Sequence, residues 1–211
     1  MSVLQELSFN IEKGKRKVVP SLVRQALDEG IDPNVILNEG MIDAMSRVGE
    51  DFRDGKIFVP EMLIAAKAMQ AGVAVLKPAL AAGGTVSRGK IILGTVAGDL
   101  HDIGKNLVGM MLESAGFEVI DLGVDVADEK FLDTYNANPD VKIICLSALL
   151  TTTMPAMRSA VAKINAAPWR GKVKVMVGGA PITQAFADEI GADAYTADAA
   201  SAAQKAKEFV M

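Results

Sequence analysis

The sequence predicts an α/β protein in which a bundle of four N-terminal helices precedes a doubly wound, five-stranded parallel sheet. Two observations predict this fold. Residues 1–82 show only the apolar periodicity of helices, whereas short apolar runs alternate with helical patterns from Lys90 onward. A short segment rich in glycine and other small residues separates the two parts. In this chain of 211 residues we therefore expect a helical domain over 1–82, a linker over 83–89 and an α/β domain over 90–211.

The four helices of the first domain are expected from capping signals and apolar stripes. Two lie around Leu4–Ile11 and Val18–Leu27. Asp32 followed by Pro33 is typical of a helix start, and it begins the third. The fourth starts near Pro60, and its apolar residues recur at alternating spacings of four and three, as in helices that bundles bury. The stripes of the third and fourth helices are Met41, Met45, Val48 and Phe52, and Met62, Ala66, Met69, Val73, Leu76 and Leu80.

The second domain alternates strands with helices, the pattern of a parallel sheet covered by helices on both faces. The expected strands are Ile91–Val96, Glu118–Asp121, Val141–Leu146, Val173–Val177 and Ala194–Tyr195. The expected helices are Lys105–Ala115, Asp128–Asn136, Met154–Ile164, Thr183–Ile190 and Ala199–Val210. The spacing of these elements leaves the order of the strands open.

Charge and composition exclude several classes of function. The net charge is −4 and the basic residues are scattered, so there is no electrostatic footprint for nucleic acid. We find no signal peptide at the start of the chain and no apolar stretch near the roughly 18 residues of a membrane span, and we expect a cytoplasmic protein. The single cysteine, Cys145, has no disulfide partner within the chain and lies in a β-branched run, which favours a buried apolar role.

The chain has one histidine, His101, within Asp99-Leu-His-Asp-Ile-Gly104. This loop follows the first expected strand, and ligands of open α/β sheets bind at the carboxyl ends of strands. Asp99 is placed to accept the proton of one ring nitrogen and so leave the other free for a metal. No second histidine or cysteine pair completes a zinc site, so a metal already held by a macrocycle suits this ligand better. The alternative is an ordinary turn, with His101 solvated and Asp102 capping the next helix.

Two further loops are expected at the same edge of the sheet. Ser147-Ala-Leu149 and the threonines Thr151–Thr153 follow the third strand, and Gly178-Gly179 follows the fourth. Each feature alone is weak, because paired glycines often only turn the chain and hydroxyl residues often only start a helix. Their combination with the histidine loop is the informative observation.

In this order and spacing, Asp99-x-His101-x-x-Gly104, Ser147-x-Leu149 and Gly178-Gly179 resemble the cobalamin-binding module of corrinoid proteins. The stretch 98–106 is similar to that of cobalamin-dependent methionine synthase, and 52–60 is similar to the helical cap segment of the same family. The resemblance covers nearly the whole chain. In size and layout the chain looks most like the small corrinoid proteins of methyltransferase systems in anaerobes.

The resemblance implies a Rossmann- or flavodoxin-like domain that binds cobalamin in the base-off, histidine-on mode. His101 would be the lower axial ligand of the cobalt, Asp99 would bond its distal nitrogen, and Thr153 would continue that chain of bonds where methionine synthase has a serine. The other residues that the resemblance implies for the same loop are Gly98, Leu100, Asp102, Ile103 and Gly104.

Further positions carry roles that the resemblance implies for the nucleotide tail and for the cap. Ser147, Leu149 and Thr151 would line the channel for the nucleotide tail, Gly178 and Gly179 would let the tail pass close to the backbone, and Ala199 would close the tail pocket. Phe52 and Val59 would lie in the cap over the methyl face of the corrin, and a role in the core of the bundle is the equal alternative.

The function implied is that of a methyl carrier. A substrate-specific methyltransferase would methylate the cobalt, a second methyltransferase would pass the methyl group to an acceptor such as tetrahydrofolate or coenzyme M, and a further protein would reactivate the cobalt by reduction. The chain would not be active alone.

Three other readings stay open. A corrinoid-sensing regulator would usually add a basic DNA-binding segment, which we do not find. The cobalamin domain of a carbon-skeleton mutase pairs with a large barrel instead of a helical cap. A phosphate- or nucleotide-binding domain is disfavoured because Gly-x-Gly-x-x-Gly and P-loop sequences are both missing.

Overall fold

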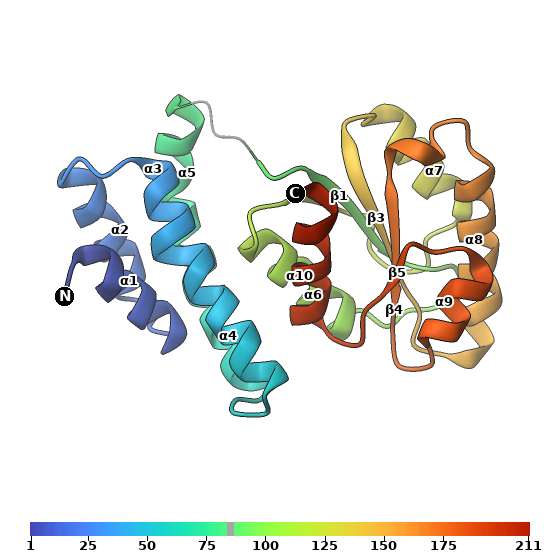
Figure 1. Ribbon diagram of the computed structural model, residues 1–211, viewed down its shortest axis with the longest axis horizontal. Coiled ribbons are helices and arrows are strands. Elements are labelled where there is room, and N and C mark those ends of the chain that lie inside the picture. The colour runs from blue at the N-terminus through green and yellow to red at the C-terminus, as the bar shows by residue number, and fades with distance from the viewer. Residues whose placement is uncertain (84–86) are drawn as a thin grey trace. The chain divides into compact units, whose positions relative to one another are not determined.

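The computed structural model describes residues 1–83 and 87–211, and these fall into two compact units (Figure 1). One unit holds the N-terminal helices, and the other holds the sheet. The linker expected over 83–89 lies partly outside the described residues, because 84–86 are not among them. Gly83 ends the last helix of the first unit, so that helix runs slightly further than expected.

The first unit consists of the helices that the sequence predicts. Its elements are α1 (Val3–Glu12), α2 (Val19–Asp28), α3 (Pro33–Val35), η1 (Ile36–Ile42), α4 (Asp43–Arg53) and α5 (Val59–Gly83). Ser2 and Gln5 form a reciprocal cap at the start of α1, and Asp32 caps α3 through the Asn34 N–H at 2.8 Å. The apolar stripe of α5 is largely buried, with Met62, Met69 and Leu76 fully enclosed.

The third predicted helix is interrupted by a π-helical segment, η1, that lies between α3 and α4. Gly40 lies in this segment and packs against α1, because a Cβ added there would be 2.9 Å from Leu7 Cδ2. The sequence pattern does not predict the π segment, since apolar spacing does not distinguish it from an α-helix.

The expectation that no apolar stretch approaches the length of a membrane span is wrong for α5. Its residues Val59–Leu80 are long and apolar enough to span a membrane by length and composition. The core helix of a bundle has the same composition, and the buried stripe of α5 fits that role.

The second unit is built on a parallel sheet that covers residues 90–195 of the described chain. The strands are β1 (Lys90–Thr95), β2 (Glu118–Asp121), β3 (Val141–Ser147), β4 (Lys174–Gly178) and β5 (Ala194–Tyr195). The α-helices are α6 (Ile103–Ser114), α7 (Asp128–Ala137), α8 (Met154–Ala166), α9 (Gln184–Ile190) and α10 (Ala199–Val210), with short 3-10 turns η2 (Thr151–Thr153) and η3 (Arg170–Lys172). The doubly wound fold class is confirmed.

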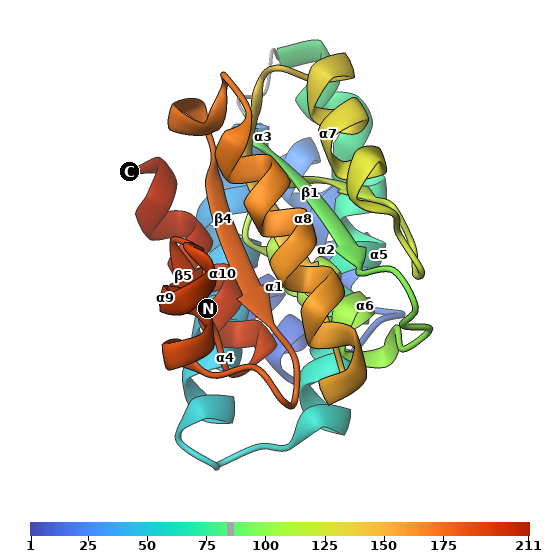
Figure 2. The ribbon, with the colours of Figure 1, turned by 90° about the vertical axis from the view of Figure 1, so that its right-hand side faces the viewer.

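The strand order is β2-β1-β3-β4-β5, and each neighbouring pair is parallel. Helices α6 and α10 lie on one face of the sheet, and α7, α8 and α9 lie on the other (Figures 1 and 2). The core on the second face includes Ile92, Ile144 and Val175 from the strands and Phe131 and Val161 from the helices. This order reverses direction between β1 and β3, which makes their carboxyl ends the topological switch point where ligands of such sheets bind.

The single cysteine lies in the middle of the sheet. Cys145 of β3 pairs in register with Leu93 and Met176 and is buried. Burial raises the pKa of its thiol to about 12, because a thiolate would lose its hydration there. The prediction of a buried apolar role for this residue agrees with its position.

We expect the Cys145 thiol of the native protein to resist a disulfide reagent such as DTNB at pH 8. With a pKa of about 12 the thiol stays neutral at that pH, and the thiol itself is a poor nucleophile. Unfolding in guanidinium should expose it and give stoichiometric release of the chromophore within minutes. Rapid stoichiometric labelling without denaturant would contradict the buried position of β3.

Candidate functional site

The loop between β1 and α6 carries Asp99 and His101 and lies at the switch point. Thr95, the last residue of β1, donates its hydroxyl to the carbonyl oxygen of His101 at 2.9 Å, which draws the loop back over the strand end. The neighbouring loop after β3 lies beside it, since Val96 N–H donates to Ser147 O at 3.0 Å. The structure thus brings together the two loops that the sequence predicts to meet.

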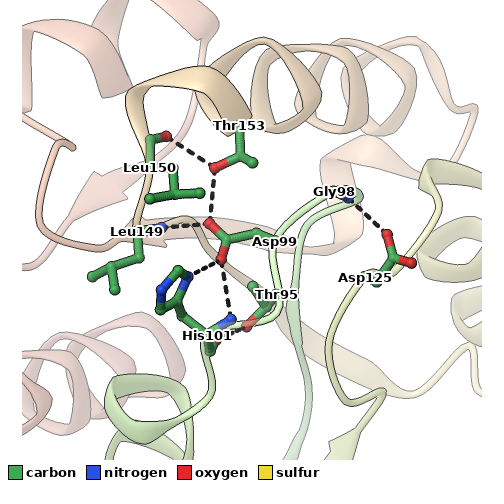
Figure 3. Close-up of polar contacts among 8 residues, drawn as sticks. All are labelled: Thr95, Gly98, Asp99, His101, Asp125, Leu149, Leu150 and Thr153. Carbon is green, nitrogen blue, oxygen red and sulfur yellow. Dashed lines mark hydrogen bonds and ion pairs between the residues drawn. The ribbon is translucent and has the colours of Figure 1, made fainter.

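The carboxylate of Asp99 is fully buried and accepts hydrogen bonds on both oxygens (Figure 3). Its Oδ1 accepts from His101 Nδ1 at 2.7 Å and from the His101 N–H at 3.1 Å. Its Oδ2 accepts from the Leu149 N–H at 2.7 Å and from the Thr153 hydroxyl at 2.8 Å. Burial alone would raise the pKa of Asp99, but these donors outweigh it and hold the pKa well below its usual range.

The ionised carboxylate determines which ring nitrogen of His101 carries the proton. A carboxylate can only accept, so Nδ1 must donate at the 2.7 Å contact. The lone pair of Nε2 is then free to bind a metal. The side chain is 49% exposed, so the imidazole is fixed on one edge and open on the other.

Thr153 is buried, and it joins the carboxylate to the loop after β3. Its hydroxyl lies 2.8 Å from Asp99 Oδ2 and 2.9 Å from Leu150 O. A hydroxyl has a single proton, and the charged carboxylate is the stronger of the two acceptors. The side chains of Thr153, Asp99 and His101 therefore form a continuous chain of hydrogen bonds.

The surface beside His101 is unusually apolar. Leu100 and Ile103 of the same loop are 72% and 84% exposed, and Leu149 and Leu150 of the neighbouring loop are also exposed. An imidazole among exposed leucine and isoleucine side chains fits a large, mostly apolar ligand that carries its own metal. Among the described residues, no group of three or more histidine, cysteine or acidic side chains is placed to hold a metal ion.

Other site residues of the sequence prediction lie at the same edge of the sheet. Ser147 ends β3 and pairs in register with Thr95 and Gly178. Thr151 is exposed at the start of η2. Ala199 is the first residue of α10 and is buried.

The remaining predicted residues of the histidine loop flank His101. Gly98 has a φ of +79°, which glycine adopts without strain. Asp102 directly precedes α6, and its carboxylate accepts from the side-chain amide of Asn106, Nδ2, at 3.1 Å, which is a contact between side chains and not a cap on a backbone N–H. Gly104 lies in the first turn of α6, with open space where a Cβ would be.

Gly179 is required by the fold itself. Its φ is +128°, and an added Cβ would lie 1.8 Å from the carbonyl oxygen of Ala148. At Gly178 an added Cβ would lie 3.1 Å from Thr196 O. The paired glycines therefore let β4 approach its neighbours closely, which explains them without any ligand.

Phe52 and Val59 belong to the first unit, at the turn between α4 and α5. Phe52 is half-buried and Val59 is 39% exposed, and their assignment to the cofactor stays a prediction. Phe58 lies directly before α5 and is 68% exposed.

Sequence reasoning also missed residues that hold the histidine loop in place. Thr95 binds the carbonyl of His101, and Asp125 from the segment after β2 accepts from the Gly98 N–H at 2.7 Å (Figure 3). The first contact depends on how the loop folds back over the end of β1, and the second joins residues 27 positions apart, so neither follows from spacing in the sequence.

Comparisons with known proteins find similarity to B12-binding families and to corrinoid proteins. Residues 89–206 match the B12 binding domain family, and residues 3–77 match a second family with the same description. The dimethylamine corrinoid protein of Methanosarcina barkeri is 46% identical over 210 residues, which cover 99% of this chain and 97% of that protein.

Solved structures of two cobalamin-related proteins are also similar to this chain. A cobalamin-binding protein from Desulfitobacterium hafniense is similar with a TM-score of 0.82 and 30% identity, covering 98% of each chain. A chain of the methanol:cobalamin methyltransferase complex from Methanosarcina barkeri is similar with a TM-score of 0.85 and 27% identity, covering 99% of this chain and 79% of that one.

We expect Asp99→Asn to lower the free energy of unfolding by about 2 kcal/mol at pH 7, because the amide weakens hydrogen bonds made to a charged acceptor. Folding lowers the pKa of Asp99, so its ionised form stabilises the folded state above the ordinary value of about 4. That contribution is lost as the pH falls below this value. Urea unfolding at pH 7 and pH 3.5 should therefore show a smaller difference between wild type and variant at the lower pH.

Asp133→Asn is the matched control for this measurement. Asp133 is an exposed carboxylate on α7, and its replacement should change the stability by less than about 0.5 kcal/mol. A similarly small effect of Asp99→Asn at pH 7 would mean that the buried carboxylate does not hold the two loops together.

Proposed function

The chain belongs to the B12-binding family of corrinoid proteins, and on this premise we propose that it carries a methyl group on the cobalt of a corrinoid between two methyltransferases. The observation that carries the proposal is a single imidazole with a free Nε2, fixed by a buried carboxylate on an exposed apolar surface. That combination suits a macrocycle that carries its own metal, and the match to the B12 binding domain family favours a corrinoid.

In the proposed binding mode, His101 coordinates the lower face of the cobalt and the cofactor's own base is displaced. The residues fit this role because Asp99 holds the proton at Nδ1 and directs Nε2 outward. The bound corrinoid supplies a cobalt centre that accepts and releases a methyl group. The protein supplies orientation, since the Leu149 N–H and the Thr153 hydroxyl keep the Asp99 carboxylate in one position.

The displaced nucleotide tail is proposed to lie at the carboxyl ends of β3 and β4. Ser147, Leu149 and Thr151 are polar or exposed there, Gly178 and Gly179 follow in the neighbouring strand, and Ala199 lies at the start of α10. This proposal is supported by the position of these residues at the same edge of the sheet. For the helical unit, we propose that Phe52 and Val59 cover the corrin, a role that their partial exposure permits.

The proposed partners are a substrate-specific methyltransferase, a methyl-accepting methyltransferase and a reductive activation protein, with the whole system in the cytoplasm. The names of the similar proteins refer to different methyl donors, dimethylamine in one case and methanol in another. We propose that the partner methyltransferase selects the substrate, since similar carriers are named for different donors.

The test uses the protein reconstituted with cobalamin and reduced to cobalt(II), with electron paramagnetic resonance as the readout. The wild type should show splitting of the cobalt signal by one axial nitrogen. His101→Gly should lose that splitting, and added imidazole should restore it by entering the vacated space. After further reduction to cobalt(I) with an added chemical reductant, the wild type should become methylated when mixed with a methyltransferase and its methyl donor, whereas either component alone should be inactive.

Two results would refute the proposal. One is cobalamin that does not bind to the folded protein, and the other is a nitrogen splitting that persists in His101→Gly without imidazole. Circular dichroism of the variant checks that the fold is retained, which we expect because the exposed His101 side chain contributes little to the core.

A further inference from the structure

We infer that Asp125 is a positioning residue that sets the geometry of the His101 loop. Asp125 belongs to the segment between β2 and α7, outside every motif that the sequence singles out. The inference rests on the proposed function, because positioning matters here only if His101 ligates cobalt.

Asp125 contacts the start of the loop through its side chain (Figure 3) and also through its backbone. Its Oδ1 accepts from the Gly98 N–H at 2.7 Å, and its own N–H donates to Asp99 O at 2.9 Å. One residue thus binds both Gly98 and Asp99, and Asp99 lies two residues before His101. A shift of this pair would move the carboxylate that orients the imidazole.

The backbone of Asp125 is strained, which indicates that its side chain makes a contact that offsets the strain. Its φ is +54°, and it is the one non-glycine residue with a positive φ among residues 1–83 and 87–211. A glycine would adopt this conformation freely, as Gly123 does two residues earlier with a φ of +84°. Asp125 is exposed, so burial does not account for the residue, whereas its bond to Gly98 does.

The other end of the loop is held by the same part of the chain. Lys105 in the first turn of α6 is buried, and its ammonium group pairs with the carboxylate of Asp121, the last residue of β2. The second oxygen of Asp121 accepts from the Gly123 N–H at 2.8 Å, which fixes the carboxylate. Acidic residues of β2 and the following segment therefore hold the loop at Gly98 and at Lys105, with His101 between them.

The experiment compares three substitutions of Asp125 in the full chain reconstituted with cobalamin. Asp125→Asn keeps an acceptor oxygen and a residue type that tolerates positive φ. Asp125→Gly removes the acceptor and relieves the strain, and Asp125→Ala removes the acceptor but keeps the strain. Asp140→Asn is the control, since Asp140 is an exposed carboxylate that pairs with Lys90 at the opposite, amino-terminal edge of the sheet.

The inference predicts that Asp125→Gly and Asp125→Ala bind cobalamin about tenfold more weakly, as is typical when an outer partner of a metal ligand is removed. Both should also lose part of the axial nitrogen splitting in the cobalt(II) spectrum. Asp125→Asn and Asp140→Asn should resemble the wild type in both measurements. The thermal midpoint of Asp125→Gly should stay near that of the wild type, so that the spectral change reports position and not unfolding.

The outcomes separate this inference from the proposed function. Wild-type affinity and full nitrogen splitting in Asp125→Gly would overturn the inference and leave the proposed function standing. A loss in Asp125→Ala alone would assign the effect to backbone strain and also overturn it. A wild type without nitrogen splitting would overturn the proposed function itself.

Discussion

The site depends on a charge that has been removed from water. The Asp99 carboxylate is fully buried, and a buried charge is tolerated only where hydrogen bonds replace its hydration. Leu149, Thr153 and His101 supply those bonds, and they come from two different loops. The need to satisfy this one carboxylate therefore brings the β3–α8 segment against the β1–α6 segment and orients the imidazole at the same time. If Asp99 were neutral or displaced, its bonds to Leu149, Thr153 and His101 would weaken, and the two loops would be held mainly by backbone pairing at the ends of β1 and β3.

The strand order explains why this carboxylate lies where a ligand can reach its histidine. The chain winds outward from β1 and β3 in opposite directions, so helices do not cover the carboxyl ends of these two strands in the same way. His101 can be half-exposed while Asp99, two residues earlier, is enclosed. The result is an imidazole that is rigid on the Nδ1 side and accessible on the Nε2 side. The exposed leucine and isoleucine side chains beside it supply an apolar surface for the macrocycle.

Much of this architecture follows from sequence patterns, and the rest depends on tertiary contacts. Apolar periodicity predicts the helices of both units and the strands to within one or two residues, because burial acts on each element separately. It does not predict strand order, because the sequence of a parallel strand does not identify the strands that pair with it. The π segment around Gly40 and the close approach of Gly179 to Ala148 depend on neighbours distant in sequence. The contact between Asp125 and Gly98 cannot be predicted from the sequence for the same reason, since the two residues lie 27 positions apart.

The central claim is that the lone histidine of the chain is the nitrogen ligand of the cofactor's cobalt. Since the chain has a single histidine, growth with ¹⁵N-labelled histidine labels one imidazole and no other. The most direct measurement is the electron paramagnetic resonance spectrum of the labelled protein with cobalamin in the cobalt(II) state. The account predicts that the triplet from axial ¹⁴N becomes a doublet from ¹⁵N. A triplet that persists after labelling would show that the cofactor's own base is the ligand and would contradict the account.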